Sequence, residues 1–140
     1  MPKADENRES IQMAVEAVMR MEADGGWAIV AGPDSKDVWP DADGGLYVQW
    51  ARSQDELRFE ACEPGQFGGT AHSPAVVSAL EKEGLSASEG NYIREFEVPA
   101  AEGADWQVVA QEVTQLACDV MFNVFGLDPS TELEFQVESN

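Results

Sequence analysis

The sequence predicts a single α+β domain in which helices cover one face of a twisted antiparallel sheet of about five strands. Three observations predict this class: short segments that alternate apolar and polar residues, amphipathic helical stretches, and connections rich in glycine, proline or polar residues. The expected element order is α-β-β-β-α-β-α-β. A chain of 140 residues has the usual size of one domain and can bury a core. We expect 1–8 and 139–140 to be flexible ends.

The first predicted helix covers about residues 5–23, where apolar side chains fall on one side at 100° per residue. The acidic residues of its first turn favour the positive end of the helix dipole. Its apolar positions are Ile11, Ala14, Val15, Ala17, Val18 and Met21. Gly25-Gly26 ends the helix, and the short apolar segment 27–31 is the first predicted strand.

The stretch 44–62 predicts two paired antiparallel strands, around which the rest of the chain is organised. Residues 46–51 and 57–62 each alternate with a period of two, and the polar tetrad 53–56 is a suitable hairpin loop. Before them, 32–45 is rich in glycine, proline and aspartate and indicates a long connection. We expect helices to cover one face of this sheet and the other face to be partly available to a partner.

A short helix is predicted over 74–83, with Ser73 as its N-cap and Pro74 at its first position. Gly84 closes this helix. Residues 86–90 are expected to form a polar connection without regular structure.

The C-terminal part predicts a strand over 91–98, the longest helix over 105–125, and a last strand at 132–138. Gly126 is the expected stop of the long helix. The last strand alternates most regularly, with Leu133, Phe135 and Val137 on one side and Glu132, Glu134, Gln136 and Glu138 on the other.

The long helix carries two apolar stripes on nearly opposite sides. The first contains Val109, Val113, Leu116, Val120 and Val124, which the sheet of the same chain can cover. The second contains Cys118, Met121, Phe122 and Phe125. It must meet either another helix of the same chain or another molecule, and the second possibility makes these four residues a candidate dimer interface.

The composition is strongly acidic, with 27 Asp and Glu against 8 Lys and Arg and a net charge of −19. Such a field repels nucleic acids and anionic membranes and favours cationic partners. A solubilising surface or adaptation to a salty cytoplasm explains the same charge. The chain shows no membrane-spanning apolar run and no signal-peptide pattern at its start, so we expect a cytoplasmic protein without membrane contact.

Groups for catalysis or metal binding are sparse. The single histidine, His72, lies in a loop without an acid or cysteine close by, and the glycine-rich run 65–69 lacks the Gly-Lys-Ser/Thr of a phosphate-binding loop. Cys62 and Cys118 are expected to be buried free thiols. The aspartates Asp34, Asp37, Asp41 and Asp43 do not fit a calcium-binding EF-hand, because a loop starting at Asp41 has Arg52 at its twelfth position, where a glutamate is required. We therefore expect no catalytic residue, no metal and no cofactor; a deep pocket joining Asp34, Asp37 and His72 would instead indicate an enzyme.

Several short aromatic and glycine motifs stand out: Trp27, Val38-Trp39-Pro40, Gly45-Leu46-Tyr47-Val48-Gln49 and Leu57-Arg58-Phe59-Glu60. With the expected element order, they resemble the actinobacterial TY-Chap domains, relatives of the type III secretion chaperones and of YbjN. The resemblance covers about residues 10–137. It implies a chaperone-like α+β domain that binds a peptide or protein, often as a homodimer.

The function expected from the resemblance and the charge is a non-enzymatic, acidic module that binds an extended client peptide against the sheet, and the negative charge favours a basic client. The expected contact residues are Tyr47, Gln49, Trp50, Arg58 and Glu60. The alternative is an inhibitor or immunity-type protein that neutralises one basic partner.

Overall fold

A computed structural model describes residues 4–21, 26–32, 47–62, 72–88 and 90–139. In chain order the elements are α1 (Ala4–Met19), β1 (Gly26–Ala31), β2 (Tyr47–Ser53), β3 (Glu56–Ala61), α2 (Pro74–Lys82), β4 (Ser86–Ser88), β5 (Asn91–Glu97), α3 (Ala104–Cys118), a π-helical continuation η3 (Asp119–Val124) and β6 (Glu134–Ser139). The long connection predicted at 32–45, the four aspartates within it and the glycine run 65–69 lie outside the described residues, apart from Gly32.

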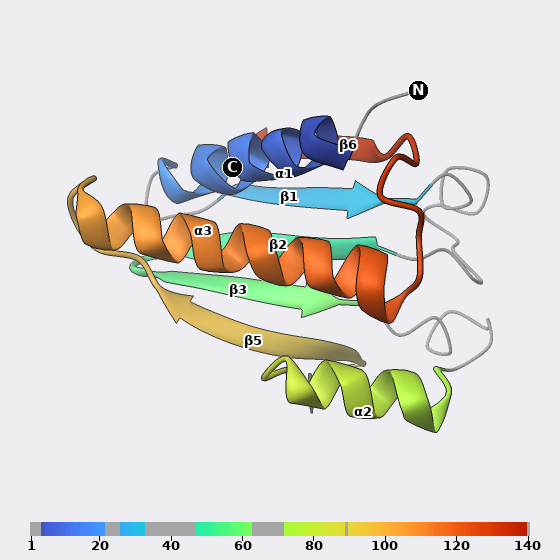
Figure 1. Cartoon of the computed structure of the whole chain (residues 1–140). Coiled ribbons are helices and arrows are strands. Elements are labelled where there is room, and N and C mark those ends of the chain that lie inside the picture. The colour runs from blue at the N-terminus through green and yellow to red at the C-terminus, as the bar shows by residue number, and fades with distance from the viewer. Residues whose placement is uncertain (1–3, 22–25, 33–46, 63–71, 89, 140) are drawn as a thin grey trace.

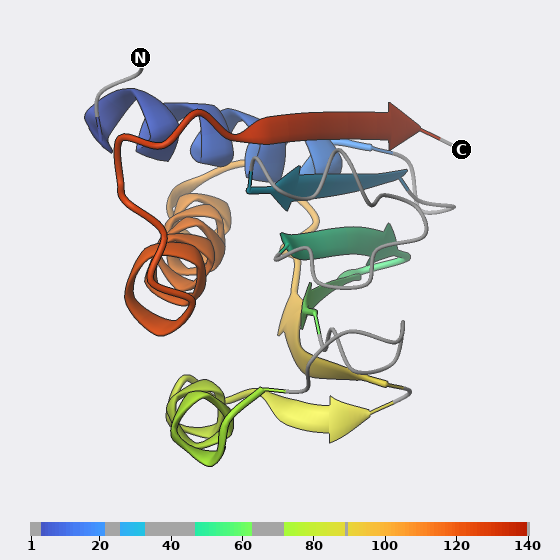
Figure 2. The same cartoon turned by 90° about the vertical axis from the view of Figure 1, so that its right-hand side faces the viewer.

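The strands form one antiparallel sheet in the order β4-β5-β3-β2-β1-β6. All helices lie on the same side of this sheet: α1 and α3 cover its middle, and α2 lies beside the end formed by β5 and β4 (Figures 1 and 2). The predicted mixture of helices on an antiparallel sheet is confirmed. The predicted count of about five strands is wrong, because β4 adds a sixth strand in the segment expected to be irregular.

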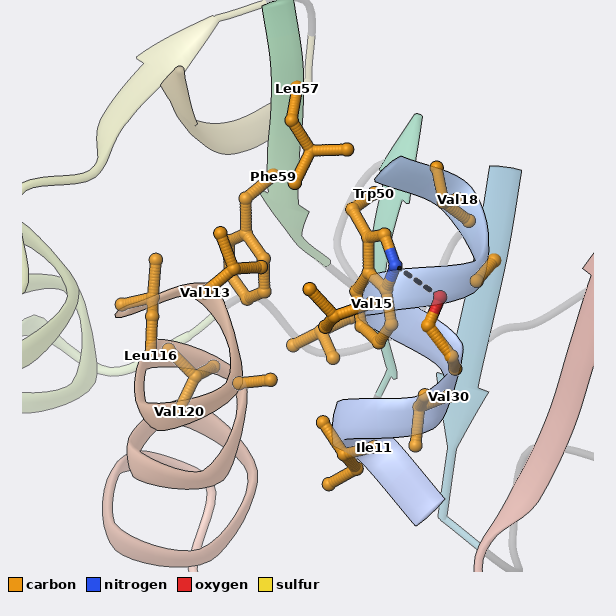
Figure 3. Close-up of a cluster of buried hydrophobic side chains, with 14 of the residues drawn as sticks. Ile11, Val15, Val18, Val30, Trp50, Leu57, Phe59, Val113, Leu116 and Val120 are labelled. Atoms are coloured by element: carbon orange, nitrogen blue, oxygen red, sulfur yellow. Dashed lines mark hydrogen bonds between the residues drawn. The ribbon is translucent and has the colours of Figure 1, made fainter. Parts of the chain in front are cut away.

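The core lies between the sheet and the pair α1 and α3 (Figure 3). At its centre the rings of Trp50 and Phe59 stack with centroids 6.3 Å apart, because β2 and β3 place these two residues opposite each other. Val15 from α1 and Val113 from α3 point toward these rings (Figure 3). The indole Nε1 of Trp50 donates a hydrogen bond of 3.3 Å to the Ala14 carbonyl, which fixes α1 against β2.

The signals that begin α2 and that end α2 and the long helix act as predicted, whereas α1 ends at Met19 instead of residue 23 and Gly26 is the first residue of β1. The Ser73 hydroxyl accepts a hydrogen bond from the Val76 amide at 3.3 Å, and Pro74 is the first residue of α2. Gly84 and Gly126 follow α2 and η3 with φ of 87° and 79°, a backbone conformation that favours glycine. At the N-terminus, residues 4–8 form the first turns of α1 where the sequence predicted a flexible end.

The last strand is tied to the first helix as well as to β1. The buried side-chain amide of Asn7 donates to the carbonyls of Pro129 at 2.7 Å and Thr131 at 2.8 Å, just before β6. Beyond these residues, β6 pairs with β1 along its whole length, from Gly26 opposite Ser139 to Ala31 opposite Glu134. The start of α1 is therefore held beside the segment that leads into β6.

Both cysteines, Cys62 and Cys118, are free and buried, as expected. Burial raises the pKa of the Cys118 thiol. None of the described helices is long and apolar enough to cross a membrane.

Candidate functional site: the acidic outer face of the sheet

The strands carry all of their carboxylates on the face of the sheet that points away from the helices, which we call the outer face. Successive side chains of a strand point to opposite faces, and residues opposite each other in a ladder share a face. Because Trp50, Phe59 and Phe96 point into the core, their neighbours along each strand point outward. The outer face carries Glu56, Glu60, Glu95, Glu97, Glu134 and Glu138.

The basic residues of the strands are divided unequally between the two faces. Arg52 and Arg94 share the helix-side face, since they lie opposite Leu57 and Phe59. Arg52 donates to the carbonyls of Met19 and Gln54, and Arg94 donates to the Glu83 carbonyl at 3.1 Å. Arg58 is the basic residue that the strands place on the outer face, which is therefore strongly negative.

A hydrogen-bonded group fixes the middle of the outer face. The carboxylate of Glu60 accepts one bond from Gln49 Nε2 at 3.2 Å and another from Asn91 Nδ2 at 3.3 Å. These residues lie on three neighbouring strands, so the ladder itself brings them together. Burial raises the pKa of the neighbouring Tyr47 phenol, while a hydrogen bond with Asn91 acts in the opposite direction. The result is a preorganised polar patch rather than a set of mobile charges.

At one end of the outer face, carboxylates from β3 and β5 lie close together. Glu56 lies opposite Glu97, and a hydrogen bond with the Glu95 carboxyl raises the pKa of Glu56, with the negative charge of Glu95 adding to this. Asp55, Glu56, Glu95, Phe96 and Glu97 line a hollow of about 380 Å³ here. Neighbouring carboxylates repel each other, so an approaching cation gains attraction and relieves this repulsion.

The structure brings together only the polar members of the predicted peptide-contact set. Gln49, Arg58 and Glu60 lie on the outer face and are half-buried. Trp50 is 0% exposed and belongs to the core, so its predicted contact with a client is wrong. Tyr47 points to the outer face but is buried with Ala31 and Cys62 in a small apolar cluster, so it is not an accessible anchor either.

The predicted dimer stripe is largely covered within one chain. Met121 is 0% exposed and Cys118 is buried, which rules out both as surface contacts in this conformation. Phe122 and Phe125 are half-buried and pack against the core. The end of the long helix contacts α2 (Figure 1), so the intramolecular alternative accounts for most of this stripe.

His72 has a packing role. Its Nε2 donates to the Cys62 carbonyl at 2.6 Å, and its ring stacks on Phe125 with centroids 5.1 Å apart. Asp34 and Asp37, which would have to join it in an enzyme, lie outside the described residues. Among the residues that the structure describes, no group of three His, Cys, Asp or Glu side chains is arranged to hold a metal ion.

Sequence reasoning missed the accessible residues of β5 and of the edge strand β6. Glu95 and Glu97 on β5, and Glu134 and Glu138 on β6, belong to the outer face, and Phe135 and Val137 are exposed on the other side of β6. The strict alternation of 132–138 carried the signal for β6, but it did not reveal that this strand ends the sheet.

Comparisons of the chain with known protein families, with curated proteins and with solved structures find no match.

Proposed function

We propose that this protein is a non-enzymatic, chaperone-like module that binds extended basic segments of other polypeptides through its sheet. One observation carries the proposal: among the described residues, the strands place six glutamates on the outer face and only one base, Arg58. Burial of the helix-side face explains why carboxylates are absent there, but it does not explain this excess of glutamate over basic residues on the accessible side. The net charge of −19 extends the same negative field to long range.

Binding would proceed in two steps that the surface suits. The acidic field attracts a basic segment and raises its rate of encounter. Lysine or arginine side chains then meet the fixed Glu60 carboxylate and the paired carboxylates of Glu56 and Glu95. Because these groups are held by neighbouring strands, little entropy is lost on the protein side.

Homodimerisation stays a prediction. Since Cys118 and Met121 are buried within one chain, a dimer through this stripe would have to use its half-buried members, Phe122 and Phe125. Measurement of the mass in solution by light scattering decides this point independently of client binding.

The test compares two triple variants with the same change in net charge. In the first, Glu56, Glu95 and Glu97 of the outer face become glutamine; in the control, the exposed helix residues Glu9, Glu81 and Glu112 do. We expect the outer-face variant to bind a lysine-rich peptide about tenfold more weakly at low salt, because each exposed ion pair contributes up to about 1 kcal/mol. The control variant should lose much less affinity for this peptide.

Equal losses in the two variants would show that only net charge matters, and the outer face would then have no special role. Absence of binding of the wild-type chain to any basic peptide at low salt would overturn the proposed function. An inhibitor of one basic partner, the alternative function, would instead show high affinity for a single folded protein and none for unrelated basic peptides.

A further inference from the structure

The edge strand β6 exposes large apolar side chains. Phe135 is 38% exposed and Val137 is 40% exposed, and the other exposed large apolar side chains of the described residues, Met13 and Val108, lie on helices. Phe135 lies opposite Val30 and Val137 opposite Ala28. Both therefore lie on the helix-side face, at the margin of the sheet where α1 passes beside β6 (Figure 2).

The same strand is acidic on its other side. Glu134, Gln136 and Glu138 point to the outer face and are exposed. A partner strand running along β6 would therefore meet an apolar row on one of its faces and a negatively charged row on the other. Such a double row selects a sequence in which two kinds of side chain alternate.

The backbone of β6 offers a place for such a strand. In the described sheet β6 pairs with β1 on one side and occupies the end of the strand order. An edge strand presents amide and carbonyl groups that an extended peptide pairs with, and side-chain pockets beside it give specificity.

A second copy of the chain fits this edge poorly. Antiparallel pairing of two β6 strands about Gln136 would place Glu134 of each copy opposite Glu138 of the other. Like charges directly opposite each other destabilise a strand pair, and two molecules that each carry a net charge of −19 repel at longer range. A basic segment meets neither penalty.

We infer that β6 is the docking strand of this module, and that it pairs with an extended segment in which apolar residues alternate with lysine or arginine. The apolar residues pack beside Phe135 and Val137, and the basic residues face Glu134 and Glu138. This inference rests on the proposed function and adds to it the edge that is used and the sequence pattern that is recognised. It places the direct contacts of the docked strand at β6, so that the glutamates of β3 and β5, three and four strands away, act on that strand through long-range attraction.

The experiment uses two synthetic peptides of about seven residues, a usual strand length. In the first, lysine alternates with valine; in the second, the same residues are regrouped so that the lysines are consecutive. Affinities for the full chain are measured by calorimetry, and the amides that respond are mapped by NMR. We expect the alternating peptide to bind about tenfold more tightly, with the responses at 134–138.

The first variant replaces Phe135 and Val137 with threonine, which keeps a strong preference for strands. We expect it to lose the preference for the alternating peptide, whereas Val108→Thr, a change at a 52% exposed position on α3, should keep it. Circular dichroism and the unfolding midpoint establish that the variants are folded.

The second variant, Glu134→Lys with Glu138→Lys, retains the apolar row and reverses the charged one. It should bind the lysine–valine peptide more weakly than the wild-type chain and should gain affinity for a peptide that alternates glutamate with valine. This exchange of preference tests the edge even where the threonine variant does not fold.

The outcomes separate the two proposals. If the alternating peptide binds the wild type and all variants equally, or the NMR responses lie at Glu56 and Glu95 instead, β6 is not the docking strand while the proposed function stands. If neither basic peptide binds, the proposed function itself fails. A dimer that dissociates in the threonine variant would assign the edge to a second copy and overturn the inference.

Discussion

The side-chain amide of Asn7 connects the start of α1 to the segment before β6. It is 3% exposed and donates to two carbonyls that lie 122 and 124 positions away in the sequence. Those carbonyls belong to Pro129 and Thr131, in the segment that leads into β6. A buried polar group with two such partners positions the strand as well as the helix.

Asn7→Ala should therefore destabilise the fold by about 1–3 kcal/mol, because two carbonyls lose their donor. Urea unfolding measures this, with the exposed Glu9→Ala in the same helix as the control. Hydrogen exchange at β6 should quicken in the Asn7 variant. A variant as stable as the control would mean that water replaces the amide without cost.

The carboxyl pair of Glu56 and Glu95 makes stability depend on pH. The pKa of Glu56 is raised in the folded state, so between its ordinary value of 4.5 and the raised value the folded chain holds more protons than the unfolded chain. The stability that this group contributes is present at low pH and is lost as the pH rises through the folded pKa.

Glu95→Gln should lower the pKa of Glu56 and reduce this loss of stability, because the variant loses the hydrogen bond with the Glu95 carboxyl and the negative charge that raise this pKa. NMR titration of the Glu56 side-chain carboxyl carbon measures its pKa. Urea unfolding at about pH 4 and pH 7 measures the stability that is lost between these two pH values. The distant Glu81→Gln serves as the control. An unchanged Glu56 titration in the Glu95 variant would contradict the assigned cause.

At the scale of elements, the end of the long helix is part of the core. Met121 is 0% exposed in η3, where the helix widens to a π-helix and contacts α2. Val108, on α3, is 52% exposed. Within one helical segment, Met121 therefore has a packing role, whereas Val108 is accessible to solvent.

Met121→Ala should cost about 2–5 kcal/mol of unfolding free energy, as removal of a buried methionine side chain usually does, whereas Val108→Ala should cost about 0.5 kcal/mol or less. Thermal unfolding and light scattering together check the prediction. A change in oligomeric state without a loss of stability in the Met121 variant would restore the predicted interface.

Caps, stops and strand alternation were predicted because each depends on residues close together in the sequence. The Ser73 cap, the glycines Gly84 and Gly126, and the alternation of β6 are readable because each acts within a few residues. The strand β4 escaped prediction because its Ser-Ala-Ser sequence has no apolar pattern; it forms by pairing with β5. Pairing of that kind is a tertiary effect.

The candidate site was predictable only in part for a related reason. Alternation places Tyr47 and Trp50 on opposite faces, but it does not tell which face the helices cover. Trp50 is buried because α1 and α3 cover its face of the sheet. Phe135 is accessible because β6 lies at the end of the sheet. Both outcomes depend on contacts between residues far apart in the chain.

For the whole molecule, charge is the dominant property. A net charge of −19 on 140 residues repels itself, and the arrangement of glutamates on one sheet face concentrates that repulsion. Added salt shortens the screening length from about 10 Å at 0.1 M to about 3 Å at 1 M.

The unfolding midpoint should therefore rise by several degrees between low and high sodium chloride, while affinity for basic peptides falls. Calorimetry at several salt concentrations measures both. The triple glutamine variant of the outer face should show a smaller rise than the wild type. A midpoint that does not depend on salt would mean that the glutamates are already neutralised by bound ions.

The place of β1 between β2 and β6 has a consequence for the order of events during synthesis. Until the residues of β6 have left the ribosome, β1 is the edge strand of the sheet. Its apolar side chains Ala28 and Val30 then lack the neighbours that β6 provides. A nascent chain halted before residue 134 would be prone to aggregate at β1. The final strand covers this edge and replaces it with one in which Glu134 and Glu138 on one face offset the exposed Phe135 and Val137 on the other.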